Sequence, residues 1–199
     1  METIRGRRSH YLDSNGLTEH IQGYNNILLD LGTGDGRYVA CMAERHQQSF
    51  FIGVDACREN LRTNSQRRLT NALFVIANVQ VLPCELNGLA SHVSINFPWG
   101  SLLGSLLNAD WSLLNGLNAI TRPIAGLDIH LNADALATAN SELETGAKQI
   151  QSILNEAGWK TKRYNYMYAS ALRSFSTTWA KRLAFGRDPR AIHLSFQKS

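Results

Sequence analysis

This chain of 199 residues is short of cysteine and has no long apolar segment. Its three cysteines, Cys41, Cys57 and Cys84, are odd in number and never occur in a Cys-x-x-Cys spacing, which argues against a disulfide framework or a cysteine zinc site. We therefore expect small, buried free thiols in a reducing cytosol and no bound metal. Apolar runs such as residues 72–77 fall far below the roughly 20 residues of a membrane span. The chain also begins without an apolar stretch, so we expect neither a signal peptide nor a membrane partner.

The composition is that of a folded globular protein, with 44% apolar and 18% charged residues. A length of 199 residues fits one domain. We expect a single domain over residues 1–199, in which residues 1–25 are an N-terminal extension and residues 26–199 are the core.

Positive charge is concentrated at one end of the chain. The net charge is only +4, but residues 150–199 carry nine basic and two acidic side chains, net +7. Residues 69–149 carry two basic and six acidic side chains, net −4. This asymmetry favours a polyanionic partner that binds the C-terminal quarter.

The sequence predicts an alternation of strands and helices, because short apolar runs alternate with more polar segments. The expected strands are residues 26–31, 50–54, 73–76, 93–97, 124–131, 159–167 and 191–196, and the expected helices are residues 37–46, 56–69, 102–107, 111–120 and 142–157. Such alternation predicts an α/β, Rossmann-like fold with a mostly parallel seven-stranded sheet and helices on both faces.

A glycine-rich segment, Asp-Leu-Gly-Thr-Gly-Asp-Gly at residues 30–36, joins the first strand to the first helix. Glycine lets the backbone turn sharply and approach a ligand closely, and a helix start offers unpaired N–H groups. Asp55 ends the next strand, where a carboxylate can accept hydrogen bonds from two ribose hydroxyls. These features predict a nucleoside-cofactor site at the carboxyl edge of the sheet.

The glycine pattern does not fit a nicotinamide dinucleotide, because that fingerprint would need glycine where Arg37 stands. It resembles instead motif I of class I methyltransferases, which use S-adenosylmethionine. The ammonium group of that cofactor suits an acidic partner such as Asp30. The third strand ends in Ala77, Asn78 and Gln80, whose backbone N–H groups or polar side chains could read the adenine edge. A plain loop is the alternative for each of them.

Residues 96–100, Asn-Phe-Pro-Trp-Gly, end the fourth strand, where class I methyltransferases place the acceptor base. Proline fixes the chain direction, and Trp99 offers a flat surface on which an extruded base can stack. One alternative is a core tryptophan. Another is the Asn-Pro-Pro-Tyr motif of amino-group methyltransferases, in which the asparagine binds an exocyclic amine, although Phe97 replaces the first proline.

A second tryptophan, Trp179, has cations around it in the sequence, namely Lys181, Arg182, Arg187 and Arg190. Aromatic rings interleaved with cations suit a nucleotide, because the ring stacks on the base and the cations hold phosphates. An amphipathic helix with a solvated basic face is the alternative. Two tryptophans facing one cofactor site would enclose a flipped base between them.

Five segments resemble the aminoglycoside-resistance methyltransferases that act on N1 of adenine-1408 in the decoding site of 16S ribosomal RNA, the group that contains KamB and NpmA. They are residues 29–37, 51–55, 74–77, 97–103 and 179–187. The first two occur in many methyltransferases, whereas the last two are more specific. The resemblance implies S-adenosylmethionine as cofactor, the 30S subunit as substrate, and a monomeric cytoplasmic enzyme that gives aminoglycoside resistance.

The resemblance also implies roles for individual residues. Its cofactor contacts are Asp30, Gly32, Gly34, Asp55, Ser101 and Thr177, and the candidate set adds Thr33, Ala77, Asn78 and Gln80 from the same loops. The target base would stack between Trp99 and Trp179. The implied rRNA phosphate contacts are Arg67, Arg68, Arg182 and Arg187, with Lys181 and Arg190 as neighbouring candidates.

The chain departs from this family at three points. Gln80 stands where the family usually has glutamate, the basic glycine-containing loop before the third strand is missing, and the insertion between the fifth and sixth strands is short. These departures bear on RNA docking more than on cofactor binding. Two other functions stay open: a methyltransferase for another RNA or an exocyclic amine, and a catalytically silent RNA-binding protein with this fold.

Overall fold

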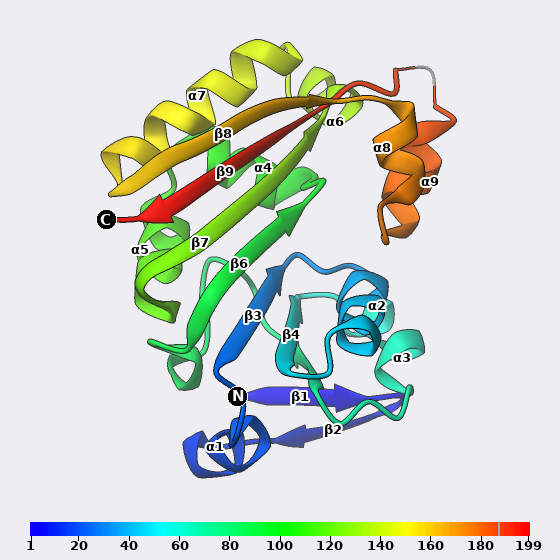
Figure 1. Ribbon diagram of the computed structural model, residues 1–199, viewed down its shortest axis with the longest axis vertical. Coiled ribbons are helices and arrows are strands. Elements are labelled where there is room, and N and C mark those ends of the chain that lie inside the picture. The colour runs from blue at the N-terminus through cyan, green and yellow to red at the C-terminus, as the bar shows by residue number, and fades with distance from the viewer. Residues whose placement is uncertain (187) are drawn as a thin grey trace.

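The computed structural model describes residues 1–186 and 188–199, without the side chains of Thr178 and Trp179. In these residues nine strands form one sheet in the order β2-β1-β5-β4-β3-β6-β7-β9-β8 (Figure 1). The strands are β1 (Glu2–Arg5), β2 (Arg8–Tyr11), β3 (Asn26–Leu31), β4 (Ser49–Asp55), β5 (Ala72–Ile76), β6 (Ala90–Asn96), β7 (Thr121–Asn132), β8 (Trp159–Met167) and β9 (Ala191–Lys198).

The expected seven-stranded, mostly parallel sheet needs correction. All seven predicted strands are present, but the N-terminal hairpin β1–β2 adds two more. Strands β5, β4, β3, β6 and β7 are parallel, whereas β1, β2, β8 and β9 pair antiparallel, so half of the eight pairings among the described strands are antiparallel. Each hairpin strand has only four residues and carries arginine, so no apolar run reveals it in the sequence.

Helices cover both faces of this sheet. They are α1 (Ser14–Ile21), α2 (Arg37–Arg45), α3 (Arg58–Ser65), α4 (Gly100–Leu107), α5 (Trp111–Ile120), α6 (Ala133–Thr138), α7 (Leu143–Glu156), α8 (Ala169–Ser174) and α9 (Thr178–Ala184), with a short 3-10 turn at Cys84–Leu86. Figure 1 shows α2 and α3 in front of the sheet, α4, α5 and α7 behind it, and α8 with α9 beside the ends of the strands. Helix α3 is shorter than predicted, because residues 66–71 form a turn that leads into β5.

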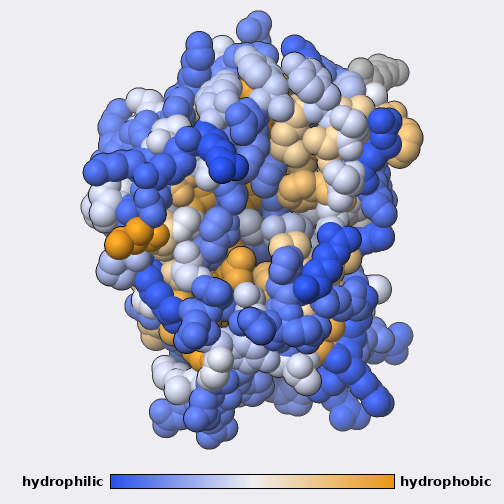
Figure 2. Space-filling model, viewed as in Figure 1, coloured by the Kyte–Doolittle hydropathy of each residue, from blue (hydrophilic) through white to orange (hydrophobic). Residues whose placement is uncertain are grey.

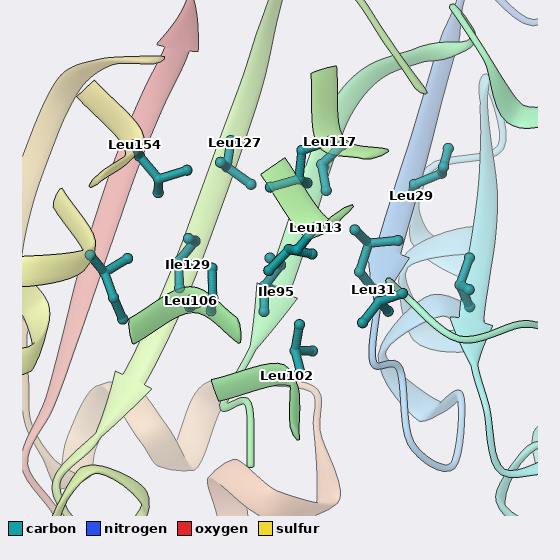
Figure 3. Close-up of a cluster of buried hydrophobic side chains, with 14 of the residues drawn as sticks. Leu29, Leu31, Ile95, Leu102, Leu106, Leu113, Leu117, Leu127, Ile129 and Leu154 are labelled. Atoms are coloured by element: carbon teal, nitrogen blue, oxygen red, sulfur yellow. The ribbon is translucent and has the colours of Figure 1, made fainter. Parts of the chain in front are cut away.

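The main core lies between the sheet and the helices behind it. Figure 3 shows leucines and isoleucines of β3, β6 and β7 facing the leucines of α4, α5 and α7. A second cluster packs α2 and α3 on the opposite face, around Phe51, Leu61 and Phe74. A third cluster attaches α8 and α9 to the sheet through Phe97, Leu172 and Leu183. The sheet is thus held rigidly at the edge where its parallel strands end.

No helix in the described parts of the chain has both the length and the apolar character needed to cross a bilayer.

The contact between α7 and the sheet is open to a direct test. Leu154 is fully buried between them (Figure 3). We expect Leu154→Ala to lower the free energy of unfolding by about 2–5 kcal/mol, because it leaves a cavity in the main core. Val81→Ala is the matched control, since Val81 is 76% exposed and its truncation should change stability by less than about 0.5 kcal/mol. Denaturant unfolding followed by circular dichroism measures both, and equal effects of the two changes would contradict this packing.

Candidate active site

A cavity of about 600 Å³ lies at the carboxyl edge of β3, β4 and β6. Its lining includes most of the predicted site residues: Asp30, Gly32, Thr33, Gly34, Asp55, Asn78, Trp99, Ser101, Thr177 and Arg182. The segments after four parallel strands, β3, β4, β5 and β6, therefore meet one C-terminal segment at a single opening. A cavity of this volume is in the range that holds a small-molecule cofactor.

The glycine-rich loop has the left-handed backbone that its sequence predicts. Gly32 has φ +69°, and a Cβ there would come within 2.6 Å of Leu102 Cδ2. Gly34 has φ +60°, and a Cβ there would meet nothing within 4 Å. Glycine is needed at the first position for close packing and at both for backbone conformation. At these two positions the loop therefore borders the cavity with backbone and no side chain.

Asp55 ties the glycine loop to the end of β4. Its Oδ2 accepts a hydrogen bond from the Gly34 N–H at 2.8 Å, and its Oδ1 accepts one from the Cys57 N–H at 2.8 Å. Each carboxylate oxygen keeps a further lone pair, and the half-buried side chain borders the cavity. Asp55 can therefore accept hydrogen bonds from a pair of hydroxyl groups while it holds the loop.

Asp30 is a carboxylate buried at the end of the central strand β3. It is 3% exposed, and its Oδ1 accepts hydrogen bonds from Ser94 Oγ at 2.7 Å and Asn96 Nδ2 at 2.8 Å. Burial raises the pKa of Asp30 to about 6, although hydrogen bonds from neighbouring side chains oppose the shift. A buried negative charge that borders a cavity suits a cationic group of a ligand.

Asn96 is held on both sides of its amide. Its Nδ2 donates to Asp30, so its Oδ1 faces the ring of His130, whose Nδ1 lies 2.9 Å away. Burial lowers the pKa of His130 to about 3, so the ring is neutral and Nδ1 carries the proton. One N–H of the amide and one lone pair of its oxygen are used within the protein, and the half-buried side chain borders the cavity. Because Oδ1 keeps a second lone pair, the alternative in which Asn96 binds the exocyclic amine of a substrate stays open.

Phe175 makes packing contacts beside the site that the sequence did not reveal. Its ring stacks on Tyr38 at a centroid distance of 5.7 Å and meets His130 edge-on at 4.6 Å. It also meets Phe97 edge-on at 5.4 Å. These contacts fasten the connection between α8 and α9 over the face that carries Asp30. No spacing in the sequence signals this contact, because its partners come from three distant segments.

The strand-end motif at residues 96–100 turns through two left-handed residues. Phe97 has φ +53° and Gly100 has φ +55°, and Phe97 is held in this conformation by burial and by the ring of Phe175. The sharp turn sets half-buried Trp99 at the cavity, just before α4 begins. Trp99 also packs against the main core, as the alternative of a core tryptophan expects, while its role in base stacking stays a prediction.

Two predicted cofactor residues lie elsewhere. The Gln80 side chain donates from Nε2 to Ser105 Oγ and Asp110 Oδ2, both at 2.8 Å, and is turned away from the cavity. The Ala77 N–H donates to the backbone oxygen of Asp55 at 3.1 Å, so it is not available to an adenine ring. Adjacent Asn78 is exposed and does border the cavity. Gln80 therefore ties its loop to α4 and to the start of α5 and does not line the site.

The C-terminal segment reaches the cavity through Thr177 and Arg182. The Thr177 hydroxyl accepts a hydrogen bond from the Ala180 N–H at 2.9 Å and so caps α9. Arg182 and Lys181 are exposed on this helix. The prediction for the Trp179 ring falls on a side chain outside the described residues, and so does the prediction for Arg187.

The other predicted RNA contacts are not beside the cavity lining. Arg67 pairs with Glu44, and Arg68 is exposed in the turn before β5. Arg190 makes a two-pronged ion pair with Asp188, with Nε and Nη2 on the two carboxylate oxygens. Among the described candidates, Arg182 is the cation that the fold brings to the opening.

The buried charge of Asp30 makes a prediction about stability. Because folding raises its pKa from 3.8 to about 6, the charged form opposes folding at neutral pH. We expect Asp30→Asn to raise the free energy of unfolding by up to about 3 kcal/mol above a pH of about 6, at about 1.4 kcal/mol per pKa unit. The gain should shrink as the pH falls from about 6 and vanish below about 3.8.

Chemical unfolding at several pH values measures this difference. Glu19→Gln removes an exposed carboxylate and should leave stability unchanged within about 0.5 kcal/mol. A loss of stability in Asp30→Asn throughout the pH range would contradict a buried Asp30 charge that opposes folding.

Comparison with known proteins bears on the acceptor. Residues 2–198 match the family NpmA, described as 16S rRNA (adenine(1408)-N(1))-methyltransferase. An Escherichia coli protein of that same description is 30% identical over 213 aligned positions, which cover 98% of this chain and 97% of the relative. The crystal structure of the aminoglycoside resistance methyltransferase NpmB1 is 30% identical, with a TM-score of 0.81 over 100% of this chain and 99% of that chain.

A third similar structure comes from Catenulisporales acidiphilia. It is a W203A mutant of a 16S rRNA (adenine(1408)-N(1))-methyltransferase with cosubstrate SAM, 24% identical, with a TM-score of 0.88 over 100% of this chain and 96% of that chain. At this identity the likeness supports the fold alone. The family match over almost the whole chain, together with the near-complete alignment to the Escherichia coli relative, shows that the chain belongs to the NpmA family of 16S rRNA (adenine(1408)-N(1))-methyltransferases.

Proposed function

We propose that this protein transfers a methyl group from S-adenosylmethionine to N1 of adenine 1408 in the 16S rRNA of the 30S subunit and thereby gives aminoglycoside resistance. The observation that carries the proposal is the meeting of Asp30, Asp55 and Trp99 at one cavity with Arg182 at its mouth. The first two suit the cofactor, and the last two suit a nucleotide and its phosphate.

The cavity residues fit S-adenosylmethionine at its two polar ends. Asp30 offers a buried negative charge for the ammonium group, and Asp55 offers free lone pairs for the ribose hydroxyls. The glycine loop between them leaves open space beside Gly34. Membership of a methyltransferase family supports the same choice. When bound, the cofactor supplies a methyl group that is already electrophilic.

The protein's own part in the reaction is mainly positioning. Adenine N1 has an in-plane lone pair, so its attack on the methyl carbon needs no general base. Trp99 provides a flat surface at the end of β6 on which the extruded base can stack, and we propose Trp179 for the other side. Holding the reacting atoms about 3–3.5 Å apart and in line supplies the rate enhancement.

Methylation at N1 explains resistance in physical terms. It adds bulk and a positive charge to the base edge that aminoglycosides hydrogen-bond. A cationic drug then loses a hydrogen-bond acceptor and meets a like charge. The +7 C-terminal quarter of the protein supports rRNA as partner, and we propose Lys181, Arg187 and Arg190 as further phosphate contacts beside Arg182.

Primer extension on 30S rRNA tests the acceptor most directly. We expect a stop at adenine 1408 after incubation with labelled S-adenosylmethionine, because N1 methylation blocks Watson–Crick pairing. Label in another position with read-through at this adenine would identify a different acceptor. Binding of the cofactor without any label transfer would indicate a silent RNA-binding protein.

Trp99 can be tested against a second tryptophan that does not line the cavity. We expect Trp99→Ala to lower methylation at least about 100-fold, because a misplaced base loses the aligned geometry. Its affinity for S-adenosylmethionine, measured by calorimetry, should change little. Trp111→Ala is the matched control, since Trp111 is 75% exposed on α5 and should keep full activity. Unfolding of Trp99→Ala would show that the ring serves mainly the core.

The pH dependence separates binding from chemistry. Protonation of Asp30 removes the charge proposed for the ammonium group, so cofactor affinity should fall about tenfold per unit below a pH of about 6. The rate at saturating cofactor should stay flat through neutrality, because no side chain has to take a proton. Initial rates at varied cofactor and pH measure both. A rate at saturating cofactor that rises steeply with pH, and no longer does so in one Asp, Glu or His variant, would contradict a mechanism without a general base.

A further inference from the structure

The free edge of the sheet carries cations that the cavity does not use. Strand β8 is the last strand in the sheet, and Lys160, Lys162 and Arg163 are exposed on it. None of their side chains makes a hydrogen bond or an ion pair with the described part of the chain. These three residues are called the β8 basic surface below. Unpaired cations in one short segment are a strongly charged patch in need of an explanation.

A bulge in β8 brings two of these charged residues to the same face of the sheet. Lys160 pairs with Gln197, and Arg163 pairs with Ser195, with a register shift between Thr161 and Arg163. Gln197 and Ser195 are two residues apart on β9 and lie on the same face of the sheet. Lys160 and Arg163 therefore share that face, whereas a regular strand would place residues three apart on opposite faces. The extra residue in the bulge is Lys162.

The shared face is the one without a helix over it. Thr161 points to the other side, where its Oγ1 accepts a hydrogen bond from Gln151 of α7 at 3.2 Å. Figure 1 shows the first half of β8 and the parts of β9 and β7 beside it from the uncovered side, with α7 behind. Figure 2 shows mostly hydrophilic surface in the same region. The β8 basic surface therefore stands at the rim of an open, polar sheet face.

The carboxylate of Asp128 on this face is held by two histidines. Asp128 on β7 lies 3.0 Å from His92 Nε2 and 2.9 Å from His193 Nε2. Burial opposes its ionised form, but the hydrogen bonds from the two histidines hold the pKa of Asp128 well below its usual range. The three cations of the β8 basic surface are thus not offset by a free carboxylate nearby.

We propose that the β8 basic surface is a second contact site for the phosphate backbone of the rRNA substrate, separate from the base-binding cavity. The proposal rests on the proposed function, since it takes rRNA as the partner. Strand β8 leads directly into α8 and α9, so one continuous segment carries these cations and Arg182. Tyr168, which is 62% exposed, follows β8 and stands between the two cationic regions along the chain. Tyr166 pairs with Ile192 and so lies on the other face of the sheet from Lys160 and Arg163. Cations with an exposed aromatic ring between them suit an RNA backbone and its bases.

Lysine at a sheet edge has another use, which is to prevent pairing with a second chain. Edge protection and RNA binding predict different effects when the charged side chains are replaced. Loss of edge protection produces self-association without a change in RNA affinity. Loss of a phosphate contact weakens RNA binding and lessens its salt dependence while the protein stays monodisperse.

The experiment compares two triple variants with the same change in charge. Lys160→Gln, Lys162→Gln and Arg163→Gln remove the β8 basic surface. Arg7→Gln, Arg45→Gln and Lys148→Gln remove three exposed cations elsewhere and are the matched control. We measure the Kd for 30S subunits at several salt concentrations by filter binding, with light scattering for association and circular dichroism for folding.

We expect the β8 variant to bind 30S subunits about tenfold more weakly at moderate salt. Its slope of log Kd against log salt should fall by about 2, because each phosphate contact contributes roughly 0.7 to 0.9. The control variant should keep the wild-type slope. Equal Kd values and slopes in the two variants would overturn the proposal, and so would self-association of the β8 variant at unchanged affinity.

Two further arms keep the outcome decisive. If the β8 triple variant aggregates, Arg163→Gln alone leaves both edge lysines in place and should still lose about a third of the slope change. Primer extension with the wild-type protein tests the proposed function in the same samples. An absent stop at adenine 1408 would contradict that function, whereas a normal stop with matching Kd values would contradict only the second contact site.

Discussion

One buried negative charge constrains the site more than any other feature. Asp30 ends the central strand, and hydrogen bonds from Ser94 and Asn96 hold its carboxylate where burial opposes ionisation. His130 contacts the other end of the Asn96 amide and so orients its Nδ2 toward Asp30. The front face of the sheet therefore has to stay polar near its centre, and the main apolar core lies behind it. We propose that this charge, kept where burial opposes it, binds the ammonium group of the cofactor.

The same polar face receives the C-terminal segment. Phe175 packs among Tyr38, Phe97 and His130, and the third apolar cluster joins α8 and α9 to the ends of the strands. Helix α9 thus stands over the cavity with Arg182 at the opening. Farther along, the face of β7, β9 and β8 stays uncovered and carries cations at its edge (Figure 1). We propose that the cavity mouth and this sheet edge together form the surface that faces RNA.

Local patterns in the sequence predict those strands and loops whose conformation depends on residues nearby in the chain. The apolar run at residues 26–31, the glycine loop and Asp55 each have a local conformation that their own residues determine. The structure places all of them as expected. The hairpin β1–β2 was missed because its strands are short and charged, and the antiparallel pairings followed from it and from β9. The position of Gln80 and the packing of Phe175 depend on partners far away in sequence, which one sequence does not reveal.

The ionisation of Asp30 is the measurement that bears most directly on this account. Carbon-13 NMR of the aspartate carboxyl groups, with Asp30→Asn to assign the signal, gives its pKa without and with S-adenosylmethionine. The account predicts a midpoint of about 6 for the protein alone and a clear fall when the cofactor is added. A midpoint near the ordinary value of 3.8, or one that the cofactor leaves unchanged, would contradict a buried charge that binds the cofactor.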